Sequence, residues 1–588
     1  MKQNVIKTVT MAVLTMASVP MTAARTTSGA TKTVQLRVVE TSDVHGYFFP
    51  YDFMEKRPLK GSLMRVNTYV RQLRSEYGDR LLLIDNGDIL QGQPTSYWSN
   101  FIAADRENIA SSMVNYMGYD CQTVGNHDIE PGHAVYDKWI REVRCPILGA
   151  NIVDKNSGQP YVKPYAVFYR EGVKIAVIGM LTPTIPYWLH ESIWKGLEFQ
   201  EMVGCARKWV RHLKEVERCD LVFGLFHSGR CGGIQAGDLM EDASEAVARE
   251  VPGFDIVFFG HDHQEHNFWV TNTAGQQVLC IDPSCWARKV ADAQIELTFK
   301  DGHLVKKDIK GQLVDVSDMD VDRQMQQHFS SEMEEIKQYV DRPIGTFASP
   351  VYTRDSYFGN SAFNDLIHNL QLKISKADIS LTAPLSFNTV IQAGPVTVGD
   401  MFKLYRFENK LYVLNMTGRE VRNHLEYSYA LWTKQMESPD DHILLLNEYS
   451  KGDQQRMGFK NYTFNFDSAA GIDYEVDVTK PAGEKVHILR MSDGTPFDEG
   501  KWYKVVMNSY RGNGGGELLT RGAGIVRDSI APRIVFQTEL DQRHYLMQEI
   551  ERMGTVDPKP NHNWRFVPEA WAKPALERDR QLLFGNSH

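Results

Sequence analysis

After its first 25 residues, the sequence has no apolar run approaching the roughly 18 residues of a membrane span. It also lacks a CxxC pair, and its 7 cysteines are an odd number. At least one thiol must therefore be free or pair between molecules. Several cysteines fall in apolar segments, where cysteine packs as a small hydrophobe. We expect no membrane span and no metal site built from cysteine.

Positive charge is not in excess either, since the formal net charge is −9. The field of such a protein does not favour nucleic acid or an acidic membrane. No nucleic acid polymer is expected as a partner, and an anionic substrate would need a local positive centre. Internal repeats and low-complexity tracts are absent from the sequence. With 588 residues, 42% of them hydrophobic, the chain is long enough for two or more globular domains. The oligomeric state stays open.

The N-terminus carries the features of a secretory signal peptide. Lys2 and Lys7 precede a mildly apolar stretch that ends in the small residues Ala23 and Ala24. We predict a signal peptide over residues 1–24, and hence a periplasmic or secreted protein. The alternative is a disordered leader on a cytosolic protein.

The rest of the chain divides into two α/β regions. Short apolar runs alternate with amphipathic stretches over residues 34–317, which predicts an α/β layered domain. A charged, periodic stretch within residues 318–345 predicts an exposed linking helix. A second α/β domain is expected over residues 346–553. Residues 554–588 are predicted to form an extended tail anchored by Trp564 and Phe566.

Polar side chains follow five of the predicted strands of the first domain, always at the carboxyl end. In α/β sheets, ligands bind outside the carboxyl ends of strands, so these side chains are expected to meet in one crevice. The candidate metal ligands are Asp43, His45, Asp88, Asn126, His227, His261 and His263.

Oxygen and imidazole donors without thiolate suit Mn²⁺, Zn²⁺, Fe or Co. Seven ligands are too many for one site with an open position, but they fit two divalent ions bridged by a carboxylate. We predict Asp88 as the bridge. Taken alone, the "GNHD" segment is equally typical of a turn and "GHDH" of a solvated loop. Five such strand ends, occurring in this order along the chain, favour the metal centre.

These motifs resemble a known superfamily. "DVHG", "GD", "GNHD", "FHSG" and "GHDH" are similar, in order, to the metallophosphoesterase signature. Further along, "NSAFNDLIHNL" and "VVMNSYRGNGGGE" resemble the C-terminal domain of 5′-nucleotidases. The segments "APLSFN" and "DYEVDVTKPAGEKV" look closest to the branch of 2′,3′-cyclic-nucleotide 2′-phosphodiesterase/3′-nucleotidases.

The resemblance implies a four-layer αββα metal domain joined by a helix to a substrate domain that rotates toward the metals. It divides the ligands into two sets that share Asp88. The set for one ion is Asp43, His45, Asp88 and His263. The set for the other ion is Asp88, Asn126, His227 and His261. It also makes His127 the catalytic histidine. Where 5′-nucleotidases carry an aspartate that orients this histidine, the sequence has Glu130, so the pair is either longer or absent. His263 stands where some members have glutamine.

The resemblance places two aromatic residues around the base of the substrate, and they correspond here to Phe407 and Tyr510. Aromatic stacking tolerates any base; the alternative is that both rings are core packing. Gly514, Gly515 and Gly516 would let backbone approach the nucleoside. A phosphate cradle there is disfavoured, because the lysine and the strand–loop–helix context of a P-loop are missing.

The sequence therefore predicts an exported phosphoesterase that hydrolyses 2′,3′-cyclic nucleotides and 3′-nucleotides through in-line attack by metal-bound hydroxide. One alternative is a 5′-nucleotidase or UDP-sugar hydrolase, in which "APLSFN" would be replaced by a glycine-rich segment with a phosphate-binding arginine. An alternative of another class is a non-catalytic nucleotide-binding protein.

Overall fold

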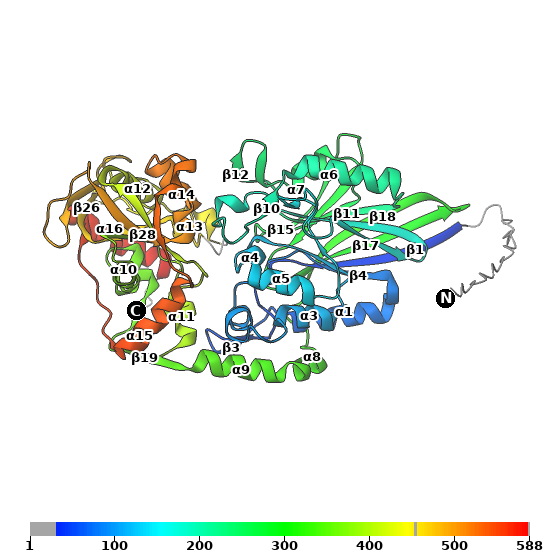
Figure 1. The fold of residues 1–588 in the computed structure, drawn as a ribbon, viewed down its shortest axis with the longest axis horizontal. Helices are drawn as coiled ribbons and strands as arrows, with labels where there is room; N and C mark the ends of the chain where they lie inside the picture. The colour runs from blue at the N-terminus through cyan, green and yellow to red at the C-terminus, as the bar shows by residue number, and fades with distance from the viewer. Residues whose placement is uncertain (1–30, 452–455, 586–588) are drawn as a thin grey trace, which may run out of the picture.

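The computed structural model describes residues 31–451 and 456–585, which form two domains side by side (Figure 1). The predicted signal peptide, residues 1–24, lies outside the described residues. Among the residues that are described, no helix combines the length and the apolar character needed to cross a membrane. All seven cysteines are unpaired thiols.

Two six-stranded sheets form the centre of the first domain. The first has the order β18 (His303–Asp315), β17 (Lys289–Lys300), β1 (Thr31–Thr41), β4 (Leu81–Asp85), β5 (Cys121–Thr123) and β6 (Ile147–Leu148). The second has the order β15 (Glu265–Thr271), β16 (Gln277–Pro283), β14 (Ile256–Phe259), β11 (Leu221–His227), β9 (Val173–Leu181) and β8 (Tyr165–Arg170). Strands β1, β4, β5 and β6 run parallel to one another, as do β9, β11, β14 and β16.

The central strands β4, β11 and β14 are buried on both faces, which explains why they read as continuous apolar runs. In β11, Leu221, Phe223 and Leu225 point into the core between the sheets. Val222 and Phe226 point the other way, toward α6 (Met202–Arg211) and α7 (Ser244–Glu250). The outer face of the first sheet is covered by α1 (Leu63–Tyr77), α3 (Ile109–Met117) and α5 (His133–Glu142). The predicted four-layer αββα arrangement is confirmed.

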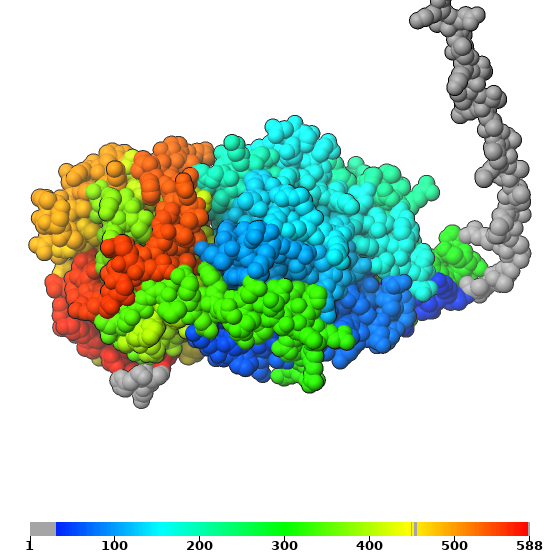
Figure 2. Space-filling model, turned by 60° about the horizontal axis from the view of Figure 1, so that its bottom comes forward, coloured from blue at the N-terminus to red at the C-terminus, as the bar shows by residue number. Residues whose placement is uncertain are grey.

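The linking segment differs from the exposed helix that we expected. It forms two helices, α8 (Arg323–His328) and α9 (Ser330–Asp341), separated at Phe329. Its apolar residues Met325, Phe329, Ile336 and Val340 are buried in the core beneath the first sheet. Four apolar side chains at helical spacing form a stripe that packs on the domain, so only the charged side faces solvent. Figure 2 shows this green segment lying across the surface of both domains.

The second domain is built on a five-stranded sheet. Its strand order is β25 (Ser468–Ala470), β21 (Ile379–Thr382), β28 (Trp502–Asn508), β24 (Leu411–Thr417) and β29 (Ile534–Gln537). The helices α10 (Ala362–Ser375) and α12 (Gly418–Trp432) begin at Ser361 and Thr417, whose hydroxyls accept backbone N–H bonds at the helix start. A smaller sheet contains β23 (Gly394–Thr397), β19 (Pro343–Phe347) and β30 (Thr555–Val556).

The prediction of an extended tail over residues 554–588 is wrong for its second half. Strand β31 (Trp564–Val567) joins β26 (Ile472–Asp477) and β27 (Val486–Met491) in a three-stranded sheet. Helix α16 (Glu569–Phe584) follows it and buries Ala572 and Ala575 in the core of the second domain. Pro574 lies inside this helix, and the proline-rich sequence before it misled the prediction. Trp564 and Phe566 are core residues rather than surface anchors.

The core between the two sheets predicts a large stability difference between two apolar truncations. Phe223→Ala removes a fully buried ring and should lower the unfolding free energy of the first domain by about 3–5 kcal/mol. Val305→Ala on β18 truncates a side chain that is 59% exposed and should change it by no more than about 0.5 kcal/mol. Urea denaturation of both variants measures the difference; equal losses would contradict the packing described here.

Candidate active site

The candidate ligands lie at the carboxyl edge of the two sheets. Asp43 and His45 follow β1, and Asp88 follows β4. Asn126 begins the short helix α4 (Asn126–Ile129) after β5. His227 ends β11, and His261 and His263 follow β14. Because these strands run parallel within each sheet, their carboxyl ends meet at one edge.

Four of these residues form a compact group. The ligand atoms of Asp43, His45, Asp88 and His263 all lie within 4.8 Å of one another. His263 Nε2 is 3.2 Å from Asp43 Oδ1 and 3.1 Å from His45 Nε2. This is the set that the family resemblance assigns to one metal ion.

Asp88 connects this group to a second one. Its Oδ2 atom is 3.7 Å from His45 Nε2 on one side and 3.2 Å from His227 Nε2 on the other. His227 Nε2 also lies 3.1 Å from Asn126 Oδ1. Asp88 thus occupies the position expected of a carboxylate shared by two ions.

His261 is placed differently from the other candidates. Its ring lies against that of His227, with 5.3 Å between the ring centroids. Its Nε2 atom, however, is directed at Glu241 Oε1, 3.3 Å away, and groups with Glu241 and Asp242. Glu241 and Asp242 end strand β13 (Leu239–Asp242) of a hairpin. No sequence pattern points to them, because carboxylates in a hairpin do not follow a buried parallel strand.

The donor set fits cations. His45 Nδ1 donates to Gln91 O at 3.1 Å and His227 Nδ1 donates to Asn86 O at 2.6 Å. A neutral imidazole that donates from Nδ1 carries a lone pair on Nε2, and both Nε2 atoms face the cluster. Asp43 Oδ1 is buried there without a hydrogen-bond partner. Converging lone pairs and carboxylates need a positive charge between them.

The charges of the cluster oppose the effect of burial at His227 and Asp88. Burial disfavours a charged imidazole, yet Asp88 and Asp43 raise the pKa of His227 to about 9. Burial likewise opposes ionisation of Asp88, but His227 and His127 hold its pKa well below the usual range. The carboxylates therefore favour positive charge at His227, whereas burial, with His263 and His127, lowers the pKa of His45 to about 4.

Five of the seven candidate ligands have a left-handed backbone, which the sequence does not reveal. The φ angles are +49° at Asp43, +49° at His45, +56° at Asp88, +82° at His261 and +58° at His263. Such angles are uncommon for residues other than glycine, and backbone strain concentrates at functional sites. The turns bend the chain sharply after each strand, so that successive side chains reach the same point.

Asp128 holds two of these turns together. Its carboxylate accepts hydrogen bonds of 2.8 Å from the backbone N–H groups of Asp88, Ile89, Leu90 and Gly125. It therefore fixes the loop after β4 to the turn after β5. The polar end of the "GNHD" segment thus contains a candidate ligand, Asn126, and a residue that supports the loop, Asp128.

His127 and Glu130 form a pair in the structure. His127 Nδ1 lies 2.5 Å from Glu130 Oε2, on the next turn of the chain. Burial opposes protonation of His127, but Asp88 and Glu130 raise its pKa to about 9. Its ring centroid is 5.4 Å from that of His45. Glutamate in place of the family's aspartate therefore still reaches the histidine.

The predicted base-stacking residues lie on the second domain. Phe407 is half-buried and packs beside the cluster that contains Phe402. Tyr510 is also half-buried and stands edge-on to Phe464, with 6.0 Å between the ring centroids. The two rings thus pack against different neighbours and do not stack against each other.

The glycines after Tyr510 form a crowded turn. A Cβ atom on Gly515 would come within 2.6 Å of the Tyr510 ring, and one on Gly516 within 2.0 Å of Asn465 Oδ1. Gly514 and Gly516 have φ of +90° and +68°. Close packing against Tyr510 explains Gly515, and the positive φ angles explain Gly514 and Gly516, without a ligand.

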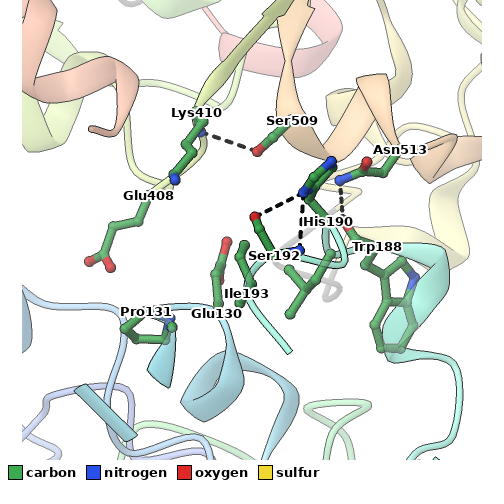
Figure 3. Close-up of a pocket in the computed structure, with 12 residues that line it drawn as sticks. Glu130, Pro131, Trp188, His190, Ser192, Ile193, Glu408, Lys410, Ser509 and Asn513 are labelled. Atoms are coloured by element: carbon green, nitrogen blue, oxygen red, sulfur yellow. Dashed lines mark hydrogen bonds between the residues drawn. The ribbon is translucent and has the colours of Figure 1, made fainter. Parts of the chain in front are cut away.

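A cavity of about 270 Å³ lies between the two domains (Figure 3). Glu130 and His190 line it from the first domain, and Glu408, Lys410 and Asn513 line it from the second. Sequence reasoning missed Glu408, which follows Phe407 directly. Burial raises the pKa of Glu408 to about 8, and Glu130 is among the charges that act on it.

The geometry separates metal binding from other roles at the centre. Asp88→Asn should lose bound metal, because a neutral amide between His45 and His227 bridges two cations poorly. His127→Ala should keep both ions, since its ring bonds to Glu130, yet lower kcat by about 10²–10³-fold, as loss of a transition-state donor does. Elemental analysis with steady-state kinetics tests both variants. The reverse pattern would show that the two roles are exchanged.

Comparisons with known proteins agree with this geometry. Residues 36–265 match the family model described as calcineurin-like phosphoesterase, and residues 343–521 match the 5′-nucleotidase C-terminal domain. A 2′,3′-cyclic-nucleotide 2′-phosphodiesterase/3′-nucleotidase of Haemophilus influenzae is 25% identical over 91% of this chain and 88% of its own length.

Two further proteins are similar to this chain over most of its length. The trifunctional nucleotide phosphoesterase protein YfkN of Bacillus subtilis is 25% identical over 91% of this chain, which spans only 39% of that relative. A Staphylococcus aureus crystal structure of a candidate 5′-nucleotidase, with bound alpha-ketoglutarate, superposes with a TM-score of 0.74 at 21% identity, covering 91% of this chain and 100% of that one. The chain is therefore a two-domain metallophosphoesterase of the 5′-nucleotidase family, with a calcineurin-like phosphoesterase domain followed by a 5′-nucleotidase C-terminal domain.

Proposed function

We propose that this protein is an exported hydrolase of 2′,3′-cyclic nucleotides and 3′-nucleotides that works with two divalent metal ions. The observation that carries the proposal is the position of Asp88 between two groups of inward-facing donors. The identity of the ions, whether Mn, Zn, Co or Fe, is left open by the donor set.

With ions bound, such a centre supplies Lewis acidity and an activated water. The chain's own residues complete the chemistry. His127, held at Nδ1 by Glu130, keeps its Nε2–H free to donate to a phosphoryl oxygen. In a buried site, a donor fixed in advance stabilises the charge of the transition state without reorganisation.

The contacts between the domains support nucleotide recognition by the second one. Asn513 Nδ2 donates to Trp188 O at 3.1 Å, which holds the Tyr510 loop against the first domain. Burial raises the pKa of Tyr510 to about 12; Arg511 opposes this, while Glu241 of the first domain adds to it. Tyr510 is therefore within electrostatic reach of the carboxylate that contacts His261.

The substrate class rests on the relatives. The Haemophilus influenzae protein, which aligns over most of both chains, is named for cyclic nucleotides and 3′-nucleotides. A 5′-nucleotidase of Vibrio cholerae matches a smaller share, 70% of this chain, at 26% identity. We therefore place the cyclic-nucleotide activity first and the 5′-nucleotidase activity second. Export is proposed from residues 1–24 alone.

A substrate panel tests this function. Purified protein with Mn²⁺ is offered 2′,3′-cyclic AMP, 3′-AMP, 5′-AMP, UDP-glucose and bis(p-nitrophenyl) phosphate. We expect the first two nucleotides to have the highest kcat/KM, EDTA to abolish turnover and added Mn²⁺ to restore it. Preference for 5′-AMP would establish the alternative activity, and full turnover in excess chelator would contradict the two-metal mechanism. Binding of nucleotide without turnover would favour a non-catalytic protein.

Base recognition by the second domain has its own test. Replacing both Phe407 and Tyr510 by Ala should remove two stacking contacts and lower kcat/KM for nucleotides by about 2–6 kcal/mol in transition-state free energy. Hydrolysis of bis(p-nitrophenyl) phosphate, which has no base, should be spared and serves as the control for folding. If both substrates lose activity equally, the two rings are core residues and do not bind the base.

A further inference from the structure

Metal-binding histidines in proteins usually donate their second ring N–H to a fixed acceptor, which sets the tautomer and the ring orientation. In this centre His45 and His227 follow the rule with backbone carbonyls, those of Gln91 and Asn86. In both cases Nδ1 is the donor, and Nε2 faces the cluster.

His261 follows the same rule with the nitrogens exchanged and a side chain as acceptor. Its Nε2 lies 3.3 Å from Glu241 Oε1. An ionised carboxylate can only accept, so Nε2 carries the proton and the lone pair is on Nδ1. The ring lies against that of His227, and with Nε2 protonated, Nδ1 is the nitrogen left to bind the second ion.

Glu241 is itself held in place by the hairpin of β12 (Gly232–Ala236) and β13. Its second oxygen, Oε2, accepts a hydrogen bond of 2.5 Å from the backbone N–H of Ile234. The strand pairing shifts register between Gly232 and Gln235. Gly233 in this bulge has φ of +66°, and a Cβ atom there would come 2.6 Å from the Glu241 carboxyl group.

We propose that Glu241 is the positioning residue of the second metal site, fixing the tautomer and orientation of His261 so that Nδ1 serves as a ligand. The proposal rests on the two-metal function proposed above. Asp242 does not replace it, because its Oδ1 is 3.9 Å from His261 Nε2 and accepts the backbone N–H of Gly229 at 2.9 Å.

A carboxylate differs from the carbonyls that orient His45 and His227. Its full negative charge makes the imidazole a more basic ligand, so the second ion would be bound more tightly than a neutral acceptor allows. It can also be replaced by mutation, whereas a backbone carbonyl cannot. The second site can therefore be weakened while the first is left intact.

The test measures metal occupancy rather than turnover. Metal-free full-length protein is dialysed against chelator-buffered Mn²⁺ over a range of free concentrations, and the ions per chain are counted by elemental analysis. Glu241→Ala should weaken the second ion by about 10–100-fold, the usual cost of such a loss, and leave the first unchanged. Glu241→Gln, whose amide oxygen still accepts a hydrogen bond, should lie between this variant and the wild type.

Three further variants separate positioning from general damage. Asp238→Asn removes a negative charge from the exposed turn of the same hairpin and should bind both ions like the wild type. Gly233→Ala should displace the Glu241 carboxylate and reproduce the loss. His261→Ala should also lose the second ion, and adding Glu241→Ala to it should cost nothing more, because Glu241 acts through His261.

Wild-type affinity for both ions in Glu241→Ala would overturn the proposal, as would additive losses in the double variant. An ion lost from Glu241→Ala but retained by Asp88→Asn would also overturn it, since that ion would belong to a separate site formed by Glu241, Asp242 and His261. If the wild type binds two ions but hydrolyses no nucleotide, the proposed substrate is wrong. The role of Glu241 is still decided by the metal affinity of its variants.

Discussion

Two buried aspartates, Asp43 and Asp88, set the requirement that the rest of the structure meets. Neither side chain is exposed by more than about one per cent, and a carboxylate removed from water needs compensating positive charge or hydrogen bonds. Here the compensation comes from histidines at the ends of neighbouring strands. The burial of these carboxylates in turn depends on the two packed sheets, which exclude water from the space where their carboxyl edges meet. The packing of the sheets and the charge balance of the buried cluster therefore depend on each other at this edge.

Much of this centre could be predicted from the sequence because parallel strands align their carboxyl ends. A polar residue that closely follows an apolar run can be recognised in the sequence itself. Asp43, Asp88 and His227 are residues of this kind. The family resemblance added the division of the ligands and the role of His127. The two-domain α/β architecture followed from the alternation of apolar and amphipathic segments.

Other features depend on contacts between distant segments, which no local pattern encodes. Glu241 lies in a hairpin and meets His261 across 20 positions. Glu408 becomes notable only because the second domain brings it into the cavity beside Glu130. The linker was predicted to be exposed because its charges are conspicuous, although four apolar residues among them pack on the first domain. The tail was taken as extended because the segment before α16 is rich in proline.

The strand pairing also has a consequence for how the protein is made. β1 pairs along its length with β17, about 250 residues later, and the second domain completes its sheets only with β30 and β31. During synthesis the two sheets of the first domain can form once residue 315 has left the ribosome, because every one of their strands is then available. The buried side chains of α8 and α9 complete its core afterwards. The second must wait for residues 555–567, and until then Tyr474 and the rest of β26 lack the neighbour that covers them. A nascent chain can therefore fold its first domain before its second. In the interval, the unpaired edge of β26 is open to pairing with another chain.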